Sequence, residues 1–209
     1  MIGVGERCLV VGKTGSGKTT TINYLIDQRQ TEPVIIMDMK IDESFEKMAK
    51  KEKGQIINGL PGGKFSKPWS GNPFFIVRPT AIEASDIGLM DDWLFQVSES
   101  SRNTLFVIDE GYMLHNEGRA GKGIVSLLTR GRSRGNSAII GSQRPRWLSK
   151  FCLTEAEHYF CMCLKNDDDR KIMAQVMGMK EIPVFPKFRG IYANPDGIVP
   201  FRVEKPKLV

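Results

Sequence analysis

The chain has 209 residues and a formal net charge of +6, with 41% hydrophobic and 26% charged residues. At about 150 residues per domain, this length allows one compact domain with a small appendage and excludes a multi-domain enzyme. The longest apolar runs, at residues 8–11 and 105–108, have the length of a strand and not of a membrane helix. The N-terminal residues lack the pattern of a secretory signal. We therefore expect a cytoplasmic protein without a transmembrane segment.

Strands and helices are expected to alternate along the first part of the chain. Residues 7–11 predict a first strand, and Ile22, Leu25 and Ile26 mark the apolar face of a helix after it. A second buried strand is expected at 34–38. Asp42 then caps a helix that ends at Gly54. This succession is typical of an α/β fold with a mostly parallel sheet covered on both faces.

The middle of the chain continues the pattern after a long loop. Glycines and prolines at 60–73 predict that loop, and strands are expected at 74–77, 105–108 and 137–141. One helix lies within 84–100, and another runs through Leu127 and Leu128. Between them, residues 115–123 are expected to form a glycine-broken loop. These elements complete a predicted core at about residues 7–145.

The last third is expected to add a strand near 159–164, a helix and a hairpin. The helix begins at 166–169, where three consecutive aspartates suit the first turn of a helix. The hairpin pairs 189–193 with 199–203 around an Asn-Pro-Asp-Gly turn at 194–197. Residues 1–209 are thus predicted to form a single α/β domain, whose C-terminal extension at about 146–209 ends in a β-hairpin.

The four cysteines are scattered, and only two histidines could join them in a metal site. Reduced thiols are the simpler interpretation. Cys161 and Cys163 would point to the same side of a strand, as two small buried side chains.

A glycine-rich segment joins the first strand to the first helix. It fits the P-loop pattern, in which two glycines flank four residues and precede a lysine and a hydroxyl residue. The glycines let backbone amides wrap phosphates, Lys18 would reach the β- and γ-phosphates, and the Thr19 hydroxyl would bind Mg²⁺. The predicted nucleotide-binding residues are Gly12, Lys13, Thr14, Gly15, Ser16, Gly17, Lys18, Thr19 and Thr20.

A second motif follows the strand at 105–108, where Asp109 and Glu110 come directly after four apolar residues. Asp109 would hold the water shell of the magnesium ion, and Glu110 is placed to polarise a water for attack on the γ-phosphorus. Because the carboxyl ends of parallel strands meet at one edge of a sheet, both acids should lie near the P-loop. The adjacent acids favour hydrolysis.

Positive charge is concentrated at residues 117–150, with eight basic residues and one acidic residue. Such a stripe predicts phosphate contact, although a solvated charged face is the common alternative. Within it, Arg130, Arg132 and Arg134 end the helix that follows the acidic motif. An arginine there could stabilise the transferring phosphoryl group on a neighbouring subunit, contact DNA phosphates or match the helix dipole. The sequence leaves these three roles open.

A polar pair, Ser142 and Gln143, follows the strand at 137–141. Its place beside the exit of a neighbouring strand would let Gln143 sense the γ-phosphate or the attacking water. A plain turn is the alternative.

Four motifs therefore occur in order: the P-loop, a strand ending in Asp-Glu, a Gly-Arg-x-x-Gly turn at 131–135 and a strand closing with Ser-Gln-Arg-Pro at 142–145. Together they resemble the FtsK–HerA superfamily of DNA-translocating ATPases. The short length resembles, within it, the genome-packaging ATPases of tailless icosahedral phages and of viruses with double jelly-roll capsids. The resemblance implies a RecA-like P-loop NTPase fold, ATP and Mg²⁺ as cofactors, and a homohexameric ring that moves double-stranded DNA. It also implies a capsid or membrane protein that docks the motor at a packaging vertex, in the host cytoplasm or on the virion.

The same resemblance assigns roles to individual residues. Thr19 and Asp109 match the magnesium positions, and Arg132 matches the arginine that acts on a neighbouring subunit, with Arg130 as the alternative. The implied catalytic set is Glu110, Lys18, Arg132, Arg130 and Gln143. One departure lies after the second strand, where Asp38-Met39-Lys40 replaces the Asp-Pro and basic residue that relatives tend to carry. Asp38 and Lys40 therefore receive no role.

DNA contact is predicted for the loop at 116–123, in which Arg119 and Lys122 lie among three glycines. This loop follows the hydrolytic acids directly, so that phosphate loss could move its basic side chains in the pore.

Three other functions remain open. A translocase of the same superfamily could serve conjugation, segregation or filamentous-phage export, a small-molecule kinase also carries a P-loop, and an assembly factor could bind nucleotide with little hydrolysis. A signalling GTPase is disfavoured because the chain has no Asn-Lys-x-Asp motif.

Overall fold

The computed structural model describes residues 2–29, 33–62, 74–116 and 119–204. Most of the predicted loop at 60–73 therefore lies outside the described residues. The described helices are α1 Lys18–Asp27, α2 Glu43–Lys51, α3 Ala81–Ser85, α4 Ile87–Ser100, α5 Lys122–Leu128, α6 Arg130–Ser133, α7 Lys150–Thr154 and α8 Asp167–Val176, with short 3₁₀ turns η1 Gly111–Leu114 and η2 Pro145–Trp147. The strands are β1 Arg7–Val11, β2 Val34–Met37, β3 Gln55–Asn58, β4 Phe74–Arg78, β5 Leu105–Ile108, β6 His115–Asn116, β7 Arg119–Ala120, β8 Ser137–Ser142, β9 His158–Met162, β10 Arg189–Asn194 and β11 Gly197–Arg202.

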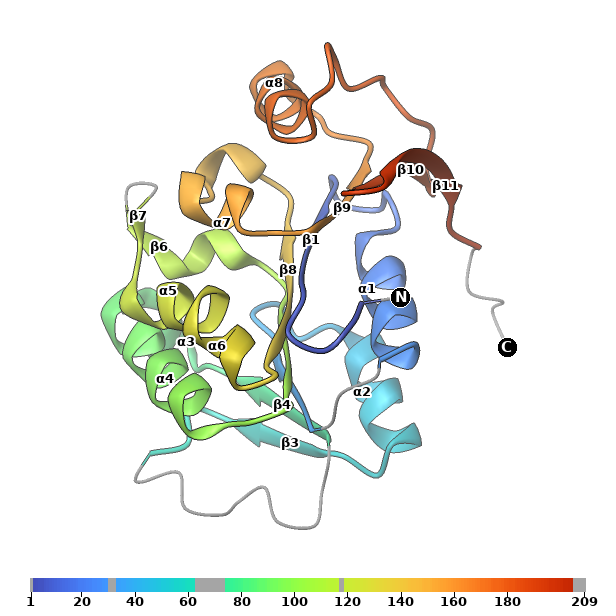
Figure 1. Cartoon of the computed structure of the whole chain (residues 1–209). Coiled ribbons are helices and arrows are strands. Elements are labelled where there is room, and N and C mark those ends of the chain that lie inside the picture. The colour runs from blue at the N-terminus through green and yellow to red at the C-terminus, as the bar shows by residue number, and fades with distance from the viewer. Residues whose placement is uncertain (1, 30–32, 63–73, 117–118, 205–209) are drawn as a thin grey trace.

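One large sheet organises the molecule (Figure 1). Nine of the described strands form it, in the order β11-β10-β9-β1-β8-β5-β2-β4-β3. The strands from β9 to β3 run parallel, and β10 and β11 are antiparallel at one end. The predicted mostly parallel α/β fold of a P-loop NTPase with a C-terminal β-hairpin is confirmed.

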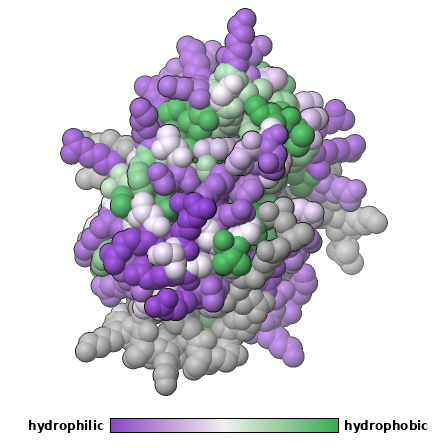
Figure 2. Space-filling model, in the orientation of Figure 1, coloured by the Kyte–Doolittle hydropathy of each residue, from purple (hydrophilic) through white to green (hydrophobic). Residues whose placement is uncertain are grey.

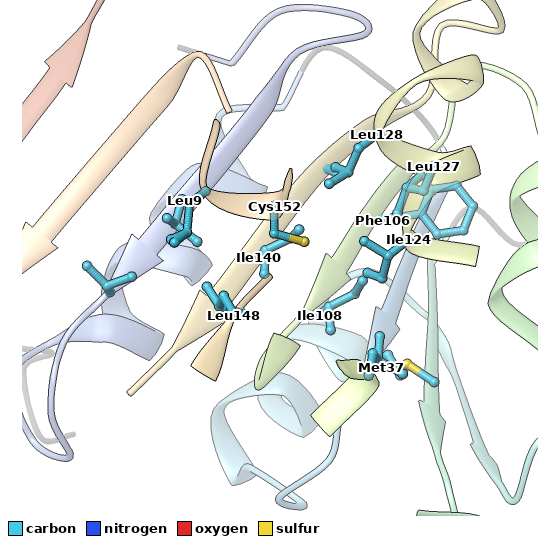
Figure 3. Close-up of a cluster of buried hydrophobic side chains, with 14 of the residues drawn as sticks. Leu9, Met37, Phe106, Ile108, Ile124, Leu127, Leu128, Ile140, Leu148 and Cys152 are labelled. Carbon is cyan, nitrogen blue, oxygen red and sulfur yellow. The ribbon is translucent and has the colours of Figure 1, made fainter. Parts of the chain in front are cut away.

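The sheet is covered on both faces, as alternation along its strands requires. Leu9 and Val11 point to one face with α4 and α5, whereas Cys8 and Val10 point to the other with α1 and α2. Figure 3 shows the first cluster, in which Phe106 packs beside side chains of α5. Phe106 is 1% exposed. The parallel core strands are fully buried runs, as the apolar segments of the sequence predicted.

Turn and cap chemistry agrees with the sequence in two places. Asp42 caps α2 by accepting a hydrogen bond from the Ser44 amide at 2.8 Å. At the C-terminal hairpin, the Asn194 side chain accepts bonds from the amides of Asp196 and Gly197 at 3.2 and 3.1 Å. These local bonds fix where α2 starts and where the hairpin turns.

Several described elements differ from the sequence expectation, and α7 was not predicted at all. Strand β3 was not predicted, because it is an edge strand paired only with β4, and it mixes two polar residues with two apolar ones. The helix expected within 84–100 is preceded by α3, which starts at a capping box between Thr80 and Glu83, and Asp86 then caps α4. The loop expected at 115–123 contains the antiparallel pair β6–β7, and α5 already starts at Lys122.

The four cysteines, Cys8, Cys152, Cys161 and Cys163, are free, as predicted, and all four are buried, whereas burial was predicted only for Cys161 and Cys163. The three aspartates do occupy the first turn of α8. They also bind arginines: Asp169 is 3.2 Å from the Nε of Arg144 and accepts the Arg146 amide at 3.1 Å. The acidic run therefore ties α8 to η2 in addition to stabilising the helix start. Among the described helices, none has the length and apolar character needed to cross a membrane.

Candidate functional site

The P-loop leaves β1 and turns into α1 through two constrained glycines. Gly17 has a φ of +107° directly before the helix, a conformation that favours glycine. A Cβ at Gly12 would lie 2.4 Å from the Ser16 hydroxyl, so only glycine, which has no Cβ, fits at this position of the loop. The first amides of α1 then face a cavity, and a helix start of this kind favours anions.

That cavity has a volume of about 270 Å³. Seven of the nine predicted nucleotide-binding residues line it, namely Lys13, Thr14, Gly15, Gly17, Lys18, Thr19 and Thr20; the other walls are Lys40, Asp42, Asp109, Gln143 and Phe188. The two remaining residues, Gly12 and Ser16, are buried and shape the loop. Small-molecule sites usually enclose about 300–1,000 Å³, so this cavity suits a phosphate chain better than a whole nucleotide.

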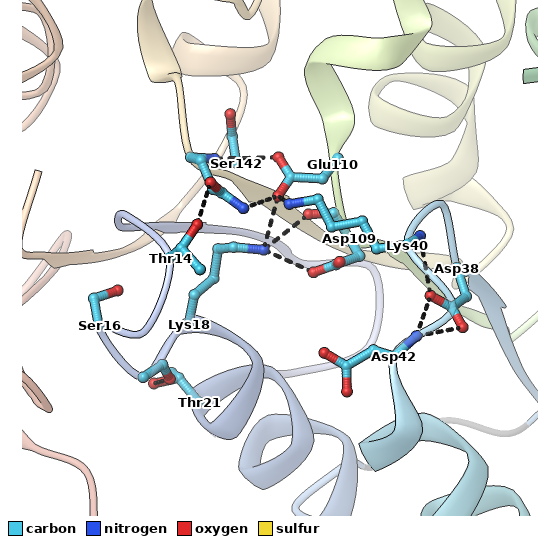
Figure 4. Close-up of polar contacts among 12 residues, drawn as sticks. Thr14, Ser16, Lys18, Thr21, Asp38, Lys40, Asp42, Asp109, Glu110 and Ser142 are labelled. Carbon is cyan, nitrogen blue, oxygen red and sulfur yellow. Dashed lines mark hydrogen bonds and ion pairs between the residues drawn. The ribbon is translucent and has the colours of Figure 1, made fainter. Parts of the chain in front are cut away.

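Lys18 and the acidic motif meet at one edge of the sheet, as predicted (Figure 4). The Lys18 Nζ donates to the Asp109 carboxylate at 2.7 Å and lies 3.3 Å from the Glu110 Oε1. It also donates to the Asp109 carbonyl at 3.2 Å. All three side chains are buried. Lys18 is therefore held by the acids at the place where phosphates would compete for it.

Two further residues hold Glu110. Gln143 donates to it twice, from its amide side chain at 2.9 Å and from its backbone at 3.2 Å. Lys40 forms an ion pair with the same carboxylate. Thr14 in turn donates to the Gln143 side chain at 2.8 Å. The predicted sensor thus bridges the P-loop and the predicted catalytic acid.

Charge in this cluster is balanced, with two lysines against two carboxylates. Burial raises the pKa of the Asp109 carboxyl above its ordinary value, and the nearby Lys18 ammonium opposes that shift. An anionic ligand at the P-loop would attract Lys18 and loosen its hold on the two acids.

Asp38, which received no role from the sequence, ties neighbouring segments together. Its carboxylate accepts the Arg78 Nε–H at 3.0 Å and the amide of Asp42 at 3.1 Å. It thereby fixes the turn that carries Lys40 to Glu110.

Arg130 and Arg132 lie away from this cluster. Both belong to α6, which precedes β8, whereas the P-loop and Gln143 follow strands at the opposite, carboxyl edge of the sheet. A six-residue strand such as β8 spans about 20 Å. Arg132 is 68% exposed and lies 3.7 Å from Glu157, and Arg130 is 62% exposed and lies 3.1 Å from Glu99. Neither reaches the cavity of its own chain.

Arg119 and Lys122 are both exposed, on β7 and at the start of α5. Lys122 pairs with Asp92 at 2.8 Å and stands over the Phe95 ring. They too lie outside the phosphate cavity.

No family model matches the chain. The chain is 28% identical over 199 residues to the DNA packaging ATPase P9 of Enterobacteria phage PRD1. The aligned region covers 90% of this chain and 81% of that protein. The resemblance to the packaging ATPases is confirmed.

The folds of two solved structures agree with this relationship. The genome packaging NTPase B204 from Sulfolobus turreted icosahedral virus 2, solved with ATPγS, superposes with a TM-score of 0.69 at 15% identity, over 96% of this chain and 98% of that one. VirB4 of Thermoanaerobacter pseudethanolicus superposes with a TM-score of 0.72 at 11% identity, over 97% and 90%. The P-loop ATPase fold therefore extends through the C-terminal third, beyond the 7–145 core on which the FtsK–HerA resemblance rested.

Two residues near the phosphate cavity were missed by sequence reasoning. Lys40 contacts Glu110, and its signal was its place two residues after the buried aspartate that ends the second strand. Phe188 lines the cavity from a segment far along the chain, and no local pattern marked it.

Proposed function

We propose that this protein is an ATP-hydrolysing motor that drives double-stranded DNA into a viral capsid. The observation that carries the proposal is the match to the packaging ATPase P9 along nearly the whole chain. The Lys18, Asp109, Glu110 and Gln143 cluster beside the P-loop supports it, because this arrangement can bind phosphates and position a water. A small-molecule kinase would instead need a shielded acceptor site.

Phosphate binding is assigned to the P-loop residues that line the cavity. Lys18 would exchange its contacts with Asp109 and Glu110 for the β- and γ-phosphates, and the amides at the start of α1 would hold the remaining phosphate oxygens. Freed from Lys18, Glu110 stays bound to Gln143 and Lys40. It can then accept a proton from the attacking water while Gln143 holds that water or the γ-phosphate.

Magnesium is assigned to Thr19 and Asp109, whose hydroxyl and carboxylate are the hard oxygen donors that Mg²⁺ prefers. Among the described residues, no cluster of three His, Cys, Asp or Glu side chains forms a metal site of its own. This fits an ion that takes most of its ligands from phosphate and water. When bound, it would neutralise charge on the phosphate oxygens.

Arg132, with Arg130 as the alternative, is proposed to act on the nucleotide of a neighbouring subunit. Its exposure at the sheet edge opposite the P-loop supports a role in trans within a ring, for which a homohexamer is the expected form. DNA in the channel would contact Arg119 and Lys122. The ring would work in the host cytoplasm, docked on a capsid or membrane protein at a packaging vertex.

The test is ATP hydrolysis measured against protein concentration, with and without long double-stranded DNA. We expect cooperative, DNA-stimulated turnover that falls about 10²–10⁴-fold in Glu110→Gln and about 10³-fold or more in Arg132→Ala. Arg102→Ala, at another exposed arginine, is the matched control and should keep its activity.

DNA contact is read from the same assay and from binding at two salt concentrations. An Arg119→Ala/Lys122→Ala double variant should bind DNA more weakly and with a shallower salt dependence. Turnover that depends on neither DNA nor protein concentration, and that is retained in Arg132→Ala, would refute the proposed motor function and point to a small-molecule phosphoryl acceptor.

A further inference from the structure

A second hollow lies beside the phosphate cavity, between α1 and the C-terminal hairpin. It has a volume of about 430 Å³, and its walls include Thr20, Thr21, Tyr24, Phe160, Phe201 and Val203. Thr20 lines both this hollow and the phosphate cavity, so the two spaces meet at the first turn of α1. In Figure 1, β11 runs toward the side of α1, and in Figure 2 hydrophobic groups gather near the C-terminal strands on a mostly hydrophilic face.

The direction of a bound nucleotide follows from the catalytic end of the cavity. A γ-phosphate that faces Glu110 and Gln143 leaves the ribose and base at the other end of the phosphate chain. Figure 4 shows Thr21 on the side of Lys18 away from Asp109 and Glu110. The phosphate cavity is small, so the ribose and base must leave it, and the hollow opens on the side that they would reach.

We propose that this hollow binds the nucleobase and ribose of the ATP whose phosphates lie at the P-loop, so that the C-terminal hairpin forms half of the nucleotide site. The inference rests on the proposed ATPase function. The walls of the hollow suit a flat ring. Tyr24 on α1 is 61% exposed, and on the opposite side Phe160 and Phe201 pack edge to face with their ring centroids 5.3 Å apart. Aromatic side chains bind bases by stacking, whatever the base edge presents.

The hairpin is fixed to the P-loop by backbone hydrogen bonds, so the hollow has a defined shape. The Phe188 amide donates to the Ser16 carbonyl at 2.8 Å, and the Val203 amide donates to the Phe188 carbonyl at 2.9 Å. The Phe188 ring also closes over Gly17, where an added Cβ would lie 3.0 Å from the ring. Both ends of the hairpin therefore depend on the P-loop conformation.

Hydrogen bonds to the polar edge of the base contribute little at this site. The Thr21 hydroxyl already donates to the Gly17 carbonyl within the helix at 3.1 Å, and the charged side chains at the rim, Arg202 and Glu204, are exposed. The hollow should therefore select for a large ring surface and accept ATP and GTP with affinities within several-fold of each other.

The test compares two probes, ATP and inorganic tripolyphosphate, by calorimetry on the full chain. Tyr24→Ala should weaken the affinity for ATP by roughly tenfold or more, as expected for one lost stacking contact, and leave the affinity for tripolyphosphate unchanged. Tyr24→Phe, which keeps the ring, should bind ATP like the native chain. Because Tyr24 is exposed, its removal should not impair folding. Phe201→Ala should act in the same direction as Tyr24→Ala.

Lys18→Ala separates this inference from the proposed function. If Lys18→Ala binds neither probe while Tyr24→Ala and Phe201→Ala bind ATP with native affinity, the proposed base site is wrong and the P-loop site stands. If Lys18→Ala binds both probes with native affinity, the proposed function itself is wrong. A preference for ATP over GTP above about 100-fold would contradict binding by stacking.

Discussion

At the scale of single residues, Lys40 is the contact that bears most on Glu110, the proposed general base. Glu110 is fully buried and shares its Oε1 between Lys18, Lys40 and Gln143. When phosphates draw Lys18 away, Lys40 and Gln143 would remain to hold the Glu110 carboxylate in place. Lys40 is thus expected to be a positioning residue for hydrolysis.

Lys40→Ala tests this role. We expect kcat for ATP hydrolysis to fall by up to about 100-fold, because the base loses its alignment, while the Kd for ATP changes by less than a few-fold. Steady-state kinetics together with calorimetry separate the two quantities. Lys47→Ala, at an exposed lysine of α2, is the control. A loss of ATP affinity as large as the loss of kcat would contradict the positioning role and place Lys40 on the phosphates.

At the scale of elements, Glu99 joins three helices. From α4 it receives two hydrogen bonds from Arg134 at 2.9 and 2.6 Å, contacts Arg130 of α6 at 3.1 Å and accepts a bond from Ser126 of α5. The Arg134 hydrogen bonds, helped by Ser126, hold the pKa of the Glu99 carboxyl below its ordinary value. This contact orients α6, the helix that carries the proposed trans-acting arginines.

Glu99→Gln should lower the free energy of unfolding by roughly 1 kcal/mol at pH 7. A carboxyl whose pKa is lowered by folding adds stability that is present above its unfolded value, here near 4.5, and is lost as pH falls through its folded value. The difference between the native chain and the variant should therefore shrink as pH falls below about 4.5. Urea denaturation at several pH values measures it, with the exposed Glu181→Gln as control. A difference that is constant with pH would contradict this account.

At the scale of the whole molecule, the two halves of the proposed hydrolytic machinery lie at opposite edges of one sheet. The P-loop, Asp109, Glu110 and Gln143 share the carboxyl edge, and Arg132 lies at the amino edge. A ring that places one subunit's amino edge against its neighbour's carboxyl edge would bring the arginine to the phosphates. Each active site would then need two chains.

Mixing two inactive variants tests this arrangement. Glu110→Gln keeps its arginine, and Arg132→Ala keeps its catalytic acid, so neighbours in a mixed ring can form complete sites. We expect each variant alone to hydrolyse ATP slowly and the mixture to regain a substantial part of native turnover. The double variant Glu110→Gln/Arg132→Ala, mixed with the native chain, should restore nothing beyond the native contribution. Failure of the mixture, with both variants assembled, would show that Arg132 acts within its own chain or has no catalytic role.

The sequence by itself determined the local features of this protein. The P-loop could be predicted because its glycines are required by the backbone geometry of the loop itself, a stretch of eight residues. Gly17 does adopt a positive φ. Strands such as Leu105–Ile108 are readable because buried parallel strands are continuous apolar runs. The rule that parallel strands share a carboxyl edge also brought Lys18 and Asp109 together correctly, at 2.7 Å.

Tertiary structure alone decided the contacts between distant segments. Lys40 reaches Glu110 because β2 and β5 are neighbours in the sheet. Phe188 bonds to Ser16 because the antiparallel strand β10 starts at the carboxyl edge, where the P-loop leaves β1. No spacing in the sequence records this strand order. The edge strand β3 escaped prediction for a related reason, since only its pairing with β4 makes it a strand. Local chemistry specifies what each segment can do, whereas packing of the sheet decides which segments meet.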